Sequence, residues 1–130
     1  MMTYASYLAN AGANVLPIEE AVTLYEEMMD SIKQCPSADT EELTNEMLIK
    51  AIKYTKVRLD WELMSFDEKM AADHSRTMCH NAYIDSLNIL ARYLNKSGAD
   101  TGWRDKLGDE RKRIGDFACF ISYVTGICNR

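Results

Sequence analysis

The chain has little of what a β-sheet protein needs. It contains two prolines and six glycines in 130 residues, and nowhere do apolar and polar residues alternate over the length of a strand. Glutamate, lysine, leucine, alanine and methionine are frequent, and these residues favour helices over sheet. The composition therefore predicts an all-α protein, and the length fits one domain, residues 1–130, with a core of its own.

Targeting and membrane-spanning sequences are also lacking. Residues 1–12 have neither the basic stretch nor the long apolar run of a secretory signal. No segment approaches the roughly 20 consecutive apolar residues of a spanning helix. We therefore expect a cytoplasmic protein that makes no membrane contact.

Metal-binding and catalytic motifs are missing as well. The four cysteines, Cys35, Cys79, Cys119 and Cys128, form no C-x-x-C pair and no zinc-finger spacing with histidine, so we expect free thiols in a reducing compartment. There is no Glu-x-x-His motif of the di-iron bundles, no Gly-rich phosphate loop and no nucleophile elbow. The sequence therefore predicts no metal and no cofactor.

The charge of the chain argues against broad nucleic-acid binding. The net charge is −5 at pH 7, and contacts to phosphates need a basic surface. One local exception is the basic cluster between positions 104 and 113, in which acidic residues are interleaved. Its basic members are Arg104, Lys106, Arg111, Lys112 and Arg113.

Helical periodicity and end signals divide the chain into four long helices and one short one. The long helices are expected at Ile18–Gln34, Glu41–Met64, Ser65–Lys96 and Asp109–Ile127, and the short one at Trp103–Leu107. Loops this short between helices favour antiparallel neighbours. The sequence therefore predicts an antiparallel four-helix up-down bundle with a short N-terminal helical arm, residues 1–16.

Capping residues set the expected helix ends. Ser65 and Glu68 have the spacing of a capping box at the start of the third helix, and Gly98 is expected to stop that helix in the left-handed conformation. Asp39 or Thr40 is the expected cap of the second helix, and Asp109 that of the last.

One row of polar residues in the third helix is unusual. At 100° per residue its members fall within an arc of about 80°, and apolar residues flank the arc on both sides. The row contains no lysine or glutamate, the usual residues of a solvated face. Its members, called the polar line below, are His74, Thr77, Asn81, Asp85, Asn88 and Arg92.

Charged residues in two other helices are candidate partners of the polar line. Arg58 and Glu62 are four apart within an apolar arc, and Asp116 lies among apolar residues of the last helix. Charges in such positions must be paired when buried, and Asp116 is expected to meet Arg92 or Arg76. The predicted network comprises Arg58, Glu62, His74, Asn81, Asp85, Asn88, Arg92 and Asp116. It is interpreted first as a structural network or as an arc that is exposed to solvent, with a small-ligand pocket or a protein-binding surface as alternatives.

Two further patterns concern packing and chemistry. Gly115, Ala118, Ser122 and Gly126 form a stripe of small residues on the last helix, which predicts close approach of a neighbouring helix.

Arg76 and His80 resemble the Arg and His pair of HEPN-type helical ribonucleases, with fewer residues between them, and a buried structural pair is the alternative.

The second half of the chain resembles a family of small all-helical proteins of bacteria and their phages to which no activity is attached. The resemblance rests on Ser75–Asn88, Gly102–Arg104, Leu107–Gly108, Arg111 and Ile114–Ala118. It implies a microbial, cytoplasmic origin and transfers no site residue.

The function expected from these patterns is binding or self-association, with a homodimer or another protein as partner. The alternative is a small-ligand-binding protein or an enzyme of phosphodiester or nucleotide chemistry that uses the polar line as its pocket.

Overall fold

A computed structural model describes residues 14–125, in which all regular structure is helical. The all-α prediction is therefore confirmed. The helices are α2 (Ile18–Lys33), α3 (Ala38–Glu62), α4 (Phe66–Lys96), α5 (Gly102–Leu107) and α6 (Arg111–Val124). Most of the expected N-terminal arm, together with Gly126, Ile127 and Cys128, lies outside the described residues.

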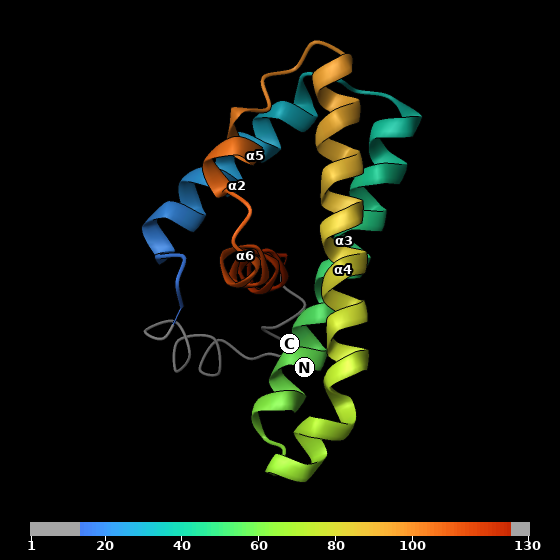
Figure 1. Cartoon of the computed structure of the whole chain (residues 1–130). Helices are drawn as coiled ribbons and strands as arrows, with labels where there is room; N and C mark the ends of the chain where they lie inside the picture. The colour runs from blue at the N-terminus through green and yellow to red at the C-terminus, as the bar shows by residue number, and fades with distance from the viewer. Residues whose placement is uncertain (1–13, 126–130) are drawn as a thin grey trace.

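Helices α3 and α4 form a long antiparallel hairpin (Figure 1). The capping box predicted at the turn is present: the Ser65 hydroxyl oxygen accepts from the Glu68 amide at 3.3 Å, and the Glu68 carboxylate accepts from the Ser65 amide at 3.0 Å. Acidic side chains in the first turn of α4 also suit the positive end of the helix dipole.

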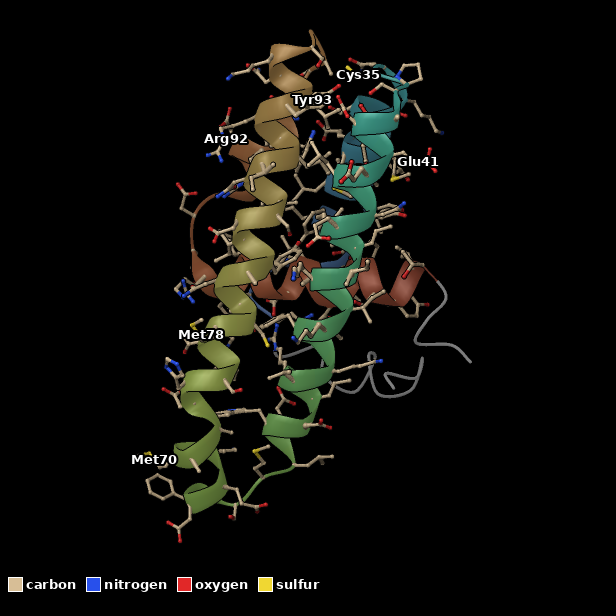
Figure 2. All side chains as sticks on the ribbon, turned by 90° about the vertical axis from the view of Figure 1, so that its right-hand side faces the viewer. Cys35, Glu41, Met70, Met78, Arg92 and Tyr93 are labelled. Carbon is tan, nitrogen blue, oxygen red and sulfur yellow. The ribbon has the colours of Figure 1, made fainter. Side chains whose placement is uncertain are left out.

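Helix α6 departs from the expected up-down arrangement. Figure 1 views it almost end-on while α3 and α4 run vertically, and Figure 2 shows it crossing behind the hairpin. Nine consecutive residues, Ile114–Ser122, are buried, whereas a helix at the corner of an up-down bundle exposes one side. Helix α6 is therefore a central helix, packed against the hairpin on one side and contacted by α2 on the other.

The stripe of small residues explains how α6 comes so close to α3. A Cβ atom at Gly115 would lie 2.8 Å from the Tyr54 hydroxyl and 3.3 Å from Nε2 of His80. Further along, the Thr55 and Ser122 hydroxyls are hydrogen-bonded at 2.9 Å. The predicted packing role of the stripe is confirmed within the described residues.

Two of the expected caps are wrong. Ser37, not Asp39 or Thr40, caps α3, and its hydroxyl accepts from the Thr40 amide at 3.1 Å. Glu110 occupies the N-cap position of α6 without a side-chain capping bond, and the Asp109 carboxylate accepts from Arg104 at 3.2 Å. The glycine stop after α4 is confirmed by a φ of 95° at Gly98.

Candidate functional site

The polar line lies on a solvent-facing side of α4. His74, Asn81, Asp85 and Arg92 are exposed, and the other two members are half-buried. The expectation of a sealed network along this line is therefore wrong, whereas the alternative of a solvent-exposed arc agrees with the burial of its residues. The reason is that one of the two apolar rows beside the polar line does not face the core, because its Met78 and Ile89 are exposed.

Two amides of the polar line nevertheless bind other helices. The Asn88 side-chain oxygen accepts from Nε of Arg104 on α5 at 2.7 Å, and the Asn81 oxygen accepts from Nη2 of Arg111 on α6 at 2.9 Å. These bonds tie the short helix and the start of α6 to α4.

Asp116 is the buried charge that the sequence indicates, but its partner differs. Its carboxylate accepts from Nη2 of Arg58 at 2.6 Å, not from Arg76 or Arg92, because the crossing of α6 places it against α3. The other carboxylate oxygen accepts from the backbone amides of Val15 and Leu16 at 2.7 and 3.0 Å. This group, called the Asp116 junction below, joins α3, α6 and the segment before α2.

A pocket of about 510 Å³ opens beside Arg58, between α3, α4 and the start of α6. Several predicted site residues meet here, although His74, Asp85, Asn88 and Arg92 do not line it. Residues of all three helices contribute to this basic pocket: Tyr54, Arg58, Trp61, Glu62, Arg76, Thr77, His80, Asn81, Arg111 and Lys112.

Positive charge dominates the basic pocket. Four of its residues are cations and one, Glu62, is an acid, although the whole chain carries −5. Arg58 is neutralised by Asp116, whereas Arg76 reaches the exposed Asp73 only at 3.5 Å. With Arg111 and Lys112 also on the wall, a positive potential faces the pocket.

Aromatic rings form part of the same wall. The guanidinium carbon of Arg76 lies 4.3 Å from the centre of the Trp61 ring, in a cation–π arrangement. The Tyr54 and His80 rings lie 4.8 Å apart, tilted by 60°. Flat, partly apolar surface and positive charge are thus adjacent.

His80 is the most constrained polar residue of the pocket. Its side chain is buried, and Nε2 lies 2.9 Å from the backbone carbonyl oxygen of Arg111. A carbonyl only accepts, so Nε2 carries the hydrogen and Nδ1 of the neutral ring holds a lone pair. That Nδ1 atom is buried and has no hydrogen-bond partner among the described residues.

The surroundings of His80 keep its ring uncharged near neutral pH. Burial lowers the pKa of His80 below its ordinary value, and the nearby positive charge of Arg111 lowers it further. A second buried polar atom among the pocket residues, the Nε donor of Arg76, also lacks a partner within residues 14–125. Two of the residues that line the pocket thus hold one buried acceptor and one buried donor without a partner among the described residues.

The sequence interpretation missed four residues of the basic pocket: Tyr54, Trp61, Arg111 and Lys112. The two aromatic residues recur at helical spacing with Arg58, which was predicted, on one face of α3. That spacing could have linked them to Arg58. Arg111 and Lys112 stood out only as part of a basic cluster. Their position depends on the crossing of α6, which no local pattern specifies.

Other kinds of site find less support within residues 14–125. No three histidine, cysteine or acidic side chains in that range lie together as a metal site would require, and no helix there is long and apolar enough to cross a membrane. Compared with protein-family models, curated proteins and solved structures, the chain has no match. The case for function therefore rests on the pocket itself.

Proposed function

We propose that the protein binds a small phosphorylated molecule in the basic pocket. The observation that carries this proposal is the convergence of Arg76, Arg111 and Lys112 on one pocket beside a buried, unpartnered nitrogen of His80. The pocket volume of about 510 Å³ falls within the usual range for small-molecule sites.

The charge pattern supports an anion over a neutral ligand. Positive residues gather here in a chain whose net charge is −5, and like charges held close together repel each other unless an anion is bound. Arginine and lysine are the residues that recognise phosphate, by paired hydrogen bonds and as a point charge respectively.

The start of α6 adds to the preference for an anion. Its first turn contains Arg111, Lys112 and Arg113 and no acidic residue, the reverse of what stabilises the positive end of a helix dipole. Arg113 is neutralised by Glu20, but the other two face the basic pocket. A bound phosphate would relieve this unfavourable arrangement.

The hydrogen-bonding groups favour a ligand that also carries a hydroxyl or N–H group. Nδ1 of His80 is an acceptor and needs a donor, which a fully ionised phosphate does not have. The Trp61 and Arg76 stack offers a flat surface for a ring. Phosphate, hydroxyl and ring together describe a nucleotide or a similar phosphorylated metabolite.

Calorimetric titration with inorganic phosphate, pyrophosphate, AMP and adenosine tests the proposal. We expect AMP and pyrophosphate to bind, adenosine to bind weakly or not at all, and rising salt to weaken the anions because exposed charges are screened. The comparison of ligands distinguishes two kinds of site. At a phosphate site pyrophosphate and AMP bind with equal affinity, whereas at a nucleotide site AMP binds more tightly than pyrophosphate.

Matched variants assign the binding to this pocket. Arg76→Gln combined with Lys112→Gln should weaken binding by about tenfold or more, which corresponds to about 1.4 kcal/mol. Lys96→Gln, at an exposed lysine of α4 that does not line the pocket, should leave the affinity unchanged. The absence of binding up to about 1 mM ligand, or equal binding by the double variant, would overturn the proposal.

Phosphodiester cleavage is a second candidate, favoured by the presence of Arg76 and His80 in one pocket. The arginine would stabilise negative charge on phosphate, and Nδ1 of His80 would accept a proton. Incubation with a single-stranded oligoribonucleotide tests it: cleavage by the wild type that His80→Gln abolishes would support an enzyme, and intact RNA in both would exclude this activity on that substrate.

A further inference from the structure

The outer face of α4 is a second feature of the molecule, which shares Asn81 with the basic pocket. It lies on the side of α4 away from α3, and Figure 2 shows Met70, Met78 and Arg92 along that edge of the helix. Asn81, in the middle of the face, also accepts from Arg111 of α6. Eight exposed residues define this outer face: Asp67, Met70, His74, Met78, Asn81, Asp85, Ile89 and Arg92.

Its composition differs from that of an ordinary solvated helix face. Met70, Met78 and Ile89 are 66%, 56% and 44% exposed, and no lysine or glutamate separates them on this face. The eight residues recur every three or four positions, which is the spacing of a seam between two packed helices. Exposed apolar side chains in such a row mark an interaction surface.

We propose that the outer face of α4 binds the same face of a second copy of this chain, with the two α4 helices antiparallel. We place the twofold axis beside the middle of α4, between positions 79 and 80. A residue a given number of positions before the axis then faces the partner's residue the same number of positions after it. Asp67 then faces Arg92, and Met70 faces Ile89.

The same register brings together the remaining residues of the face. His74 lies opposite Asp85, and Met78 lies opposite Asn81. A twofold axis repeats every pair, so the interface contains each of these contacts twice. One register thus places opposite charges together, aligns apolar side chains and buries no like-charged pair.

Charge complementarity is the reason for choosing a second copy as the occupant. The outer face is acidic at Asp67 near the start of α4 and basic at Arg92 near its end, so it complements itself only when reversed. A parallel pair would place Asp67 against Asp67 and Arg92 against Arg92, which is unfavourable. Antiparallel helix dipoles favour the same arrangement.

A charge-swap experiment read by sedimentation equilibrium tests this dimer. We expect the wild type to dimerise with rising concentration, and Asp67→Arg or Arg92→Asp alone to weaken the dimer by about tenfold or more by placing like charges together. When mixed, the two single variants should form a heterodimer, because each supplies the charge that the other lacks. The double variant should dimerise again as the wild type does.

The mixing step separates a lost interface from a lost fold, and far-UV circular dichroism checks that each variant remains helical. Glu26→Arg, at an exposed position of α2, provides the matched control and should leave the wild-type dimer intact. A wild type that stays monomeric, single variants that dimerise unchanged, or a mixture that forms no heterodimer would each refute the proposal.

Discussion

Replacement of Asp116 by alanine is the sharpest perturbation of the fold. The Asp116 side chain is fully buried, and that of Arg58 is 16% exposed. Removing the carboxylate therefore leaves a guanidinium largely out of water and without its negatively charged partner. It also removes the acceptor of the Val15 and Leu16 amides.

The expected loss of unfolding free energy follows from these contacts. Breaking a buried ion pair by removal of one partner costs about 3–5 kcal/mol. Leu16 is buried, so its unpaired amide adds about 1 kcal/mol, whereas Val15 is exposed and its amide can bind water. We expect a loss of about 4–6 kcal/mol, a large part of the roughly 5–15 kcal/mol that stabilises a domain.

Urea unfolding followed by far-UV circular dichroism measures this loss, provided that the m value stays constant. Asp116→Asn keeps the shape but can supply its one oxygen only to Arg58 or to the amides, so about half of the loss is expected. Asp85→Ala is the matched control: Asp85 is exposed on α4, and a change within about 0.5 kcal/mol is expected.

A double-mutant cycle decides whether the ion pair itself carries the effect. The cycle consists of Arg58→Met, Asp116→Leu and the two combined. The double variant removes both charges, so its loss should be about 2 kcal/mol smaller than that of Asp116→Leu alone. The reasoning would be refuted if Asp116→Ala destabilised no more than Asp85→Ala, or if the effects at positions 58 and 116 were simply additive.

Two other residues of the α3, α4 and α6 contact yield predictions of their own. His80 has a pKa lowered chiefly by burial, so the unfolded chain binds a proton more readily and stability falls as pH drops below about 6.5. His80→Gln, whose amide can still donate to the Arg111 carbonyl, should remove that fall in urea unfolding between pH 7.5 and 5; an identical pH profile would contradict the shift. Gly115→Ala places a methyl group 2.8 Å from the hydroxyl oxygen of Tyr54, and overpacking of about 1–3 kcal/mol should outweigh the helix propensity gain of about 1 kcal/mol. Higher stability of Gly115→Ala would show that Tyr54 moves aside freely.

The helices could be predicted from the sequence because their signals are local. Periodicity and the Ser65 and Glu68 capping box located α4 within a residue at each end. Asp116 was recognised as a buried charge because it lies among apolar residues of one helix. Each of these inferences needs only residues within a few turns of each other.

The polar line shows where local reasoning fails. Its flanking residues are apolar on both sides. One flank holds the buried Leu87, Ala91 and Leu94, whereas Met78 and Ile89 of the other are exposed. Hydrophobicity does not distinguish an apolar side chain in a core from one such as Met78, which stays exposed on a single chain. That distinction depends on which neighbours cover the helix.

The direction of α6 was the decisive unknown for the site. In an up-down bundle its first turn would lie at one end of the molecule, and Arg111 and Lys112 would belong to a solvated loop region. Because α6 crosses the hairpin instead, its first turn reaches the middle of α4, where the Arg111 carbonyl accepts from His80 and its guanidinium donates to Asn81. The bonds that fix this crossing thus also form the wall of the basic pocket. One packing arrangement, which Gly115 permits, therefore forms both the Asp116 junction and the pocket. A variant that shifts α6 should alter stability and ligand binding together.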